Sequence, residues 1–149
     1  MLWLIRHAMC ALYPRTEHFP GLEDLGVTEY LRRYRRESTF LMWLGLFVGA
    51  WLFAWTPWMT VYVPLPSFLL PKGLLDKHAR KITGTRIYLL RQMIFLVKLG
   101  AGTCWAIHPR VREKVGLAPY GEDPGTFRTE KTIRRLQIHK DDGVAPEAR

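Results

Sequence analysis

The longest apolar stretch of the chain runs from Ser38 to Pro71 and contains no charged residue. Its first part, residues 39–58, consists mainly of Leu, Phe, Trp, Ala, Val and Gly, so a helix built from it is apolar on every side. A helix of this length extends about 30 Å, which matches the hydrocarbon core of a bilayer. A core helix of a soluble protein usually keeps a polar face. The pattern therefore predicts a membrane helix over residues 39–58.

Prolines interrupt the rest of this stretch. Pro57 ends or kinks the helix, and Pro64, Pro66 and Pro71 exclude a long helix through VYVPLPSFLLP. The segment is either an extended return to the same side of the membrane or the end of a full crossing. Backbone without helical hydrogen bonds is tolerated at membrane depth only where protein covers it, so a return implies a partner subunit.

A second apolar helix is expected over residues 84–108. Arg91 and Lys98 are seven residues apart and share one face of it, and Trp105 lies close to the same stripe. A lysine near the middle of a membrane span costs about 2.5–3.5 kcal/mol. We therefore expect this helix either to lie at the membrane interface or to pack against a subunit whose acids pair with the two cations.

The N-terminal flank is expected to contain short helices. Residues 1–14 are apolar apart from Arg6 and His7, and they are expected either to lie at the interface or to pack on a partner. A polar loop follows, and Thr28 is placed to cap a helix that begins VTEYLRRYRRES.

Together these patterns predict an all-α membrane protein. It has one strongly hydrophobic helix, a Pro-broken extended return, one amphipathic apolar helix, and irregular basic flanks and tail. We divide it into a basic N-terminal flank with short helices (1–37), a membrane segment (38–71), a basic segment with the amphipathic helix (72–114), and an extended polar arm (115–149).

The net charge of +9 is concentrated after the membrane segment. Residues 72–114 hold ten basic residues against Asp76 and Glu113 alone. No zinc spacing, RNA-binding aromatic motif or purely basic helix supports a nucleic-acid partner. Anionic lipid headgroups are the expected counter-charge, since each Lys or Arg near a membrane surface contributes about 1 kcal/mol.

Cations beside the apolar segments are the candidate residues for binding a partner or lipid. Those are Arg32, Arg33, Arg35, Arg36, Lys77, Arg80, Lys81, Arg91 and Lys98, with Trp105 as an aromatic neighbour. Arg91 and Lys98 either pair with partner acids or extend to the headgroup layer. Gly45 and Gly49 form a small-xxx-small pair that is suited to close packing against another helix.

The basic clusters also predict orientation. The arginines directly before the apolar helix place the N-terminal flank in the cytoplasm by the positive-inside rule. If the chain crosses completely, the bases between Lys72 and Arg86 lie on the opposite side, against this rule. If the chain returns, both clusters are cytoplasmic.

No catalytic motif is visible in the sequence. It has no GxGxxG, P-loop, HExxH, CxxC or nucleophile elbow, and no metal-ligand spacing. None of the five histidines lies in the predicted membrane helix, so solvated or interfacial histidines are expected rather than haem ligands. Cys10 and Cys104 are expected to be reduced thiols.

The run CWAIHPRVREKVGL is an apolar helix that ends in HPxVRxxxGL. It resembles the end of small membrane-associated accessory proteins found with flavin dehydrogenases of the glucose-methanol-choline type. The resemblance covers about 20 residues, from Gly100 to Tyr120. It implies that FAD and catalysis belong to another chain, which this chain anchors, and it transfers no catalytic residue.

The sequence thus favours a non-catalytic membrane-anchoring accessory subunit of a larger, redox-type complex. We expect it to bind no cofactor alone, while its partner holds FAD, haem or quinone. The expected partners are a larger membrane or membrane-associated subunit and anionic lipids, and the expected location is a bacterial-type inner membrane. Two alternatives remain: a structural transmembrane subunit of a respiratory or photosynthetic complex, and a stand-alone enzyme or carrier for a lipidic substrate.

Overall fold

In the computed structural model, which describes residues 1–118, every element of secondary structure is helical. The elements are α1 (Leu2–Leu12), the 3-10 helix η1 (Leu22–Leu25), α2 (Val27–Glu37), α3 (Phe40–Trp55), α4 (Pro57–Thr60), the 3-10 helix η2 (Ser67–Leu69), α5 (Lys72–Thr83), α6 (Tyr88–Ala106) and α7 (Pro109–Lys114). The predicted all-α class is confirmed. Most of the predicted arm, 115–149, lies outside the described residues.

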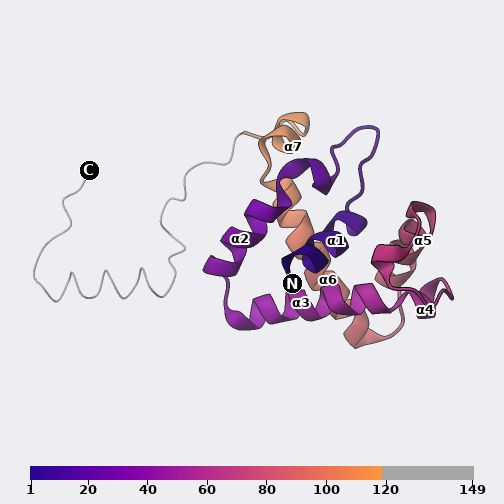
Figure 1. The fold of residues 1–149 in the computed structure, drawn as a ribbon. Helices are drawn as coiled ribbons and strands as arrows, with labels where there is room; N and C mark the ends of the chain where they lie inside the picture. The colour runs from indigo at the N-terminus through magenta and orange to yellow at the C-terminus, as the bar shows by residue number, and fades with distance from the viewer. Residues whose placement is uncertain (119–149) are drawn as a thin grey trace, which may run out of the picture. The chain divides into compact units, whose positions relative to one another are not determined.

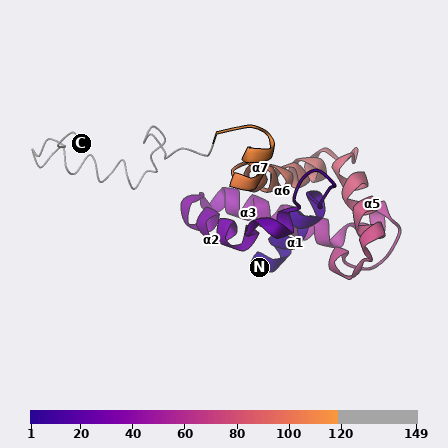
Figure 2. The same cartoon turned by 90° about the horizontal axis from the view of Figure 1, so that it is seen from above.

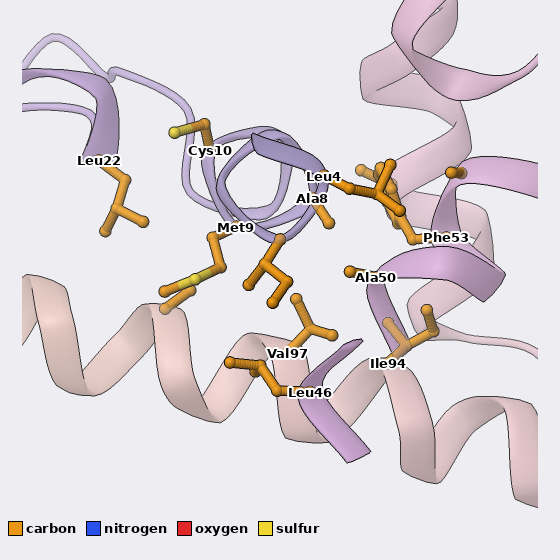
Figure 3. Close-up of a cluster of buried hydrophobic side chains, with 14 of the residues drawn as sticks. Leu4, Ala8, Met9, Cys10, Leu22, Leu46, Ala50, Phe53, Ile94 and Val97 are labelled. Atoms are coloured by element: carbon orange, nitrogen blue, oxygen red, sulfur yellow. The ribbon is translucent and has the colours of Figure 1, made fainter. Parts of the chain in front are cut away.

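Helix α1 lies against both α3 and α6, and these three helices form the core (Figures 1 and 2). Figure 3 looks along α1, from which Leu4, Ala8 and Met9 point toward the two partner helices. Ile5, Ala8 and Met9 are completely buried. The apolar side of α1 is therefore covered by this chain itself, which the sequence pattern did not predict, while Met1 and Trp3 stay exposed.

The strongly hydrophobic helix is shorter than predicted. In α3, the Thr39 side chain accepts a hydrogen bond from the Met42 amide as N-cap, and the helix ends at Trp55 after 16 residues. The Thr56 hydroxyl then donates to the Leu52 carbonyl oxygen, and Pro57 begins the separate single turn α4. A continuous helix over residues 39–58 is thus wrong, because the chain breaks before the proline.

By length and composition, none of the helices within residues 1–118 is a membrane span on its own. The pair α5 and α6 meets that test only when taken together, and the two helices are bent by 118° at their junction.

Small residues bring α3 and α6 into close contact. A Cβ atom added at Gly49 would lie 2.5 Å from the Met93 carbonyl oxygen and 2.7 Å from Val97 Cγ2. At Gly45 an added Cβ would lie 3.2 Å from a methyl group of Leu96. The packing for which this glycine pair was singled out therefore occurs within the chain, against α6.

The segment after α3 contains no long helix, as its prolines predict, but it is not simply extended: it includes the short helices α4 and η2. Residues 72–83, expected to be an irregular basic flank, instead form the regular helix α5. Its buried residues His78, Ala79 and Ile82 follow helical spacing, so one side of α5 packs on the core. Helices α4 and α5 lie together at the C-terminal end of α3 (Figure 1).

The remaining helices differ from expectation mainly at their ends. Helix α2 begins at Val27, and its N-cap is Gly26 in the left-handed conformation (φ 68°) instead of Thr28. The second apolar helix is present as α6, which begins four residues later than Gly84. Cys10 and Cys104 are both buried free thiols in the core, and burial raises the pKa of each to about 11.

Gly49→Ala should destabilise the fold by about 1–3 kcal/mol, because its Cβ meets the α6 backbone and cannot be accommodated by a side-chain rotation. Gly73→Ala is the matched control, since nothing lies within 4 Å of its added Cβ. Alanine is also up to about 1 kcal/mol better than glycine within a helix. Denaturant unfolding of both variants tests this, and equal stabilities would contradict the close α3–α6 contact.

Candidate functional site

One side of α3 is not covered by any part of residues 1–118, although it is as apolar as the buried side. Leu46, Gly49, Ala50, Phe53 and Ala54 are buried. The large side chains exposed on the opposite side of this helix are Phe40, Leu41, Leu44, Trp51 and Trp55, which we call the α3 apolar face. Exposed groups of this kind are typical of sites that bind protein or membrane.

Four arginines lie directly before this face, on α2. All four are exposed, but two make contacts within the chain: Arg33 forms an ion pair with Glu37 at 2.8 Å, and Arg35 lies over the Trp43 ring at 5.8 Å. Arg32 and Arg36 have no such contact within residues 1–118. The structure therefore leaves Arg32 and Arg36 available for an external anion.

The predicted cations of α5 also divide into two kinds. Lys81 donates a hydrogen bond to the Thr60 carbonyl oxygen at 3.0 Å and lies 5.9 Å from the centre of the Tyr62 ring. It therefore holds the α4 turn against α5. Lys77 and Arg80 are exposed and form no ion pair within the described residues.

Arg91 and Lys98 lie on the same side of α6, as their spacing predicts, and both line one pocket of about 330 Å³. Thr83 of α5 forms part of the same wall. Trp105 does not line this pocket, so the prediction that it continues the stripe of Arg91 and Lys98 is wrong. Its indole N–H donates to the Pro20 carbonyl oxygen at 3.1 Å, and its ring packs edge-on against Phe19.

A buried polar cluster that the sequence analysis did not predict lies where α1, α3 and α5 meet. His78 is completely buried, and its Nε2–H donates to the Phe53 carbonyl oxygen at 2.9 Å. Its Nδ1 consequently accepts from the Thr60 hydroxyl. His7 Nε2 is 3.0 Å from the hydroxyl oxygen of buried Ser67. These contacts join α5 and the segment between α3 and α5 to the core.

Both histidines are held neutral by their surroundings. Burial lowers the pKa of His7 below its ordinary 6.5, an effect that Glu23 partly opposes. Burial also lowers the pKa of His78, partly opposed by the bond to the Phe53 carbonyl and reinforced by His7. The expectation of solvated or interfacial histidines is therefore wrong for His78, whereas His7 is half-buried. Helical spacing with Leu74, Leu75 and Ile82 was the available signal for His78.

Within residues 1–118 no group of three His, Cys, Asp or Glu side chains is placed to bind a metal ion. Both ring nitrogens of His78 and the Nε2 atom of His7 form hydrogen bonds with protein groups, as is typical of structural side chains. Comparison with protein-family models, curated proteins and solved structures finds no match.

The free energy of unfolding should fall as the pH drops from 7 to 5. Unfolded histidine titrates near 6.5, while the pKa of each folded histidine is lower, so the unfolded chain binds more protons in this range. Each histidine kept neutral contributes a slope of up to about 1.4 kcal/mol per pH unit.

Denaturant unfolding at several pH values measures this slope. His78→Gln should reduce it, whereas His18→Gln, at an exposed position, should leave it unchanged. An unaltered slope in His78→Gln would show that this buried cluster does not govern the acid sensitivity.

Proposed function

We propose that this chain is a non-catalytic accessory subunit that binds the membrane through the α3 apolar face and anchors a larger, redox-type complex there. The observation that carries the proposal is the one-sided exposure of α3. Its inner side is used by the core, and its outer side presents Leu41, which is 74% exposed, and two tryptophans that are about half exposed. Tryptophan is enriched where protein meets the membrane–water interface.

Charge around this face supports attachment from one side. Arg32 and Arg36 on α2 and Lys77 and Arg80 on α5 are exposed and suited to anionic headgroups. A helix with an apolar outer face and neighbouring cations is typical of proteins that lie in the interface plane. In the proposed orientation both basic groups, and the N-terminal flank, are on the cytoplasmic side of a bacterial-type inner membrane.

The anchoring role requires a second surface for a partner. The segment after α3 exposes Trp58, Tyr62, Leu65 and Leu69, which provide apolar contacts apart from α3. The resemblance of CWAIHPRVREKVGL to accessory subunits of flavin dehydrogenases makes such an enzyme the first partner to test. In this proposal FAD, haem or quinone is bound by that partner and not by this chain alone.

Charge introduced on the α3 apolar face should weaken membrane binding. Burying one leucine contributes about 1.5–3 kcal/mol, so Leu41→Asp or Leu44→Asp should lower the vesicle partition coefficient about tenfold or more. Leu117→Asp is the matched control, because Leu117 is exposed but lies outside α3. Flotation with anionic vesicles measures the bound fraction.

In native membranes the wild-type chain should stay in the pellet at high-pH carbonate and be released by detergent. Release by carbonate alone, or equal flotation of all three leucine variants, would contradict attachment through α3.

A larger subunit should co-purify with the tagged chain from its native membrane in mild detergent, at constant stoichiometry and with flavin or haem absorbance. The reason is that the proposed chain is an anchor whose chemistry belongs to its partner. Mass spectrometry and an absorbance spectrum provide the measurement. A chain that purifies alone and transforms a lipidic substrate would favour the stand-alone enzyme, while assembly with respiratory or photosynthetic subunits would favour the structural alternative.

A further inference from the structure

The pocket on α6 combines two cations with apolar walls. Its lining residues are Thr83, Arg91, Gln92, Ile94, Phe95 and Lys98. Arg91 and Lys98 are separated by seven residues, or about 10 Å along the helix axis, so both long side chains reach the same space from its two ends. Such a pair is suited to an anion held between a planar guanidinium and an ammonium group.

No acid of the described structure neutralises this pair. Neither Arg91 nor Lys98 forms an ion pair in the part of the chain from 1 to 118, and residues 77–112 contain no Asp or Glu. The Arg91 guanidinium lies over the Tyr88 ring, 6.0 Å from its centre, which is a cation–π contact and does not neutralise its charge. The side chain of Gln92 forms no hydrogen bond to another described residue, so an amide donor is also available.

Beside the cations runs an exposed apolar stripe of the same helix. Tyr88, Phe95 and Leu99 recur at helical spacing and are 62%, 54% and 48% exposed. Phe95 belongs to both the stripe and the pocket wall. An occupant must therefore carry negative charge at one end and hydrocarbon at the other.

We propose that this pocket binds the headgroup of an anionic phospholipid, with the phosphate between Arg91 and Lys98 and an acyl chain along Phe95 and Leu99. This inference rests on the proposed membrane attachment and adds a specific lipid site to it. A free phosphate ion satisfies the cations but leaves the apolar stripe exposed to water. Basic pockets beside apolar helices are one setting in which proteins bind anionic lipid headgroups.

Titration with short-chain lipids tests the site. The full chain in neutral detergent is titrated with dioctanoyl phosphatidylglycerol, dioctanoyl phosphatidylcholine or inorganic phosphate, and bound lipid is counted by native mass spectrometry. One phosphatidylglycerol should bind saturably and at least about tenfold more tightly than phosphatidylcholine, because only the anionic lipid carries a net charge for both cations. Inorganic phosphate at the same concentration should not displace it.

Substitutions then assign the site. Arg91→Gln and Lys98→Gln should each weaken phosphatidylglycerol binding about fivefold, and Lys98→Arg should retain it. Arg110→Gln, at an exposed position on α7 outside this pocket, should bind as the wild type does. Equal affinity for the two lipids, unchanged binding in both glutamine variants, or displacement by phosphate would overturn the proposal.

Two further readouts separate this site from the anchor and from a partner surface. If wild-type chain floats with vesicles but shows no lipid preference in detergent, the lipid site is absent while attachment through α3 stands. If wild-type chain does not float, the proposed function itself fails. Loss of a co-purifying partner in Arg91→Gln or Lys98→Gln, without loss of lipid binding, would identify an acidic protein as the occupant and overturn the lipid assignment.

Discussion

The close approach of α3 to α6 at Gly49 is the constraint on which the rest of the structure depends. It allows backbone from α6 to occupy the space that a side chain would need, and it sets the groove in which α1 lies. Because the inner sides of α3 and α6 are both used for this contact and for α1, their outer sides are not covered by any part of residues 1–118. The exposed apolar residues and the α6 pocket are therefore consequences of how the core is built.

Hydrophobic pattern and proline positions were sufficient to predict an all-helical chain, a helix after Ser38, the absence of a long helix in the proline segment and the apolar helix that became α6. They failed where burial depends on distant residues. Helix α1 was expected to lie at the membrane interface or on a partner, because nothing in its local sequence shows that α3 and α6 pack against it. Similarly, the many charges of α5 concealed a narrow apolar side that only tertiary packing reveals.

The candidate site shows the same division between local and distant information. The seven-residue spacing of Arg91 and Lys98 predicted a shared helix face, and both line one pocket. Trp105 has the same spacing from Lys98, yet the N-terminal segment covers it through Pro20 and Phe19, more than 80 residues away in sequence. His78 was missed because a histidine among lysines and arginines suggests solvent, although its helical position is the one that faces Phe53.

The position of α1 has a consequence for biosynthesis. Its covering helices follow it in the chain, and α6 is not complete until residue 106 has left the ribosome. During that interval α1 and α3 can pack on each other, but the sides of both helices that contact α6 stay exposed, and exposed apolar surface of this kind promotes aggregation of nascent chains. Chain order therefore makes α6 the element that closes the core last.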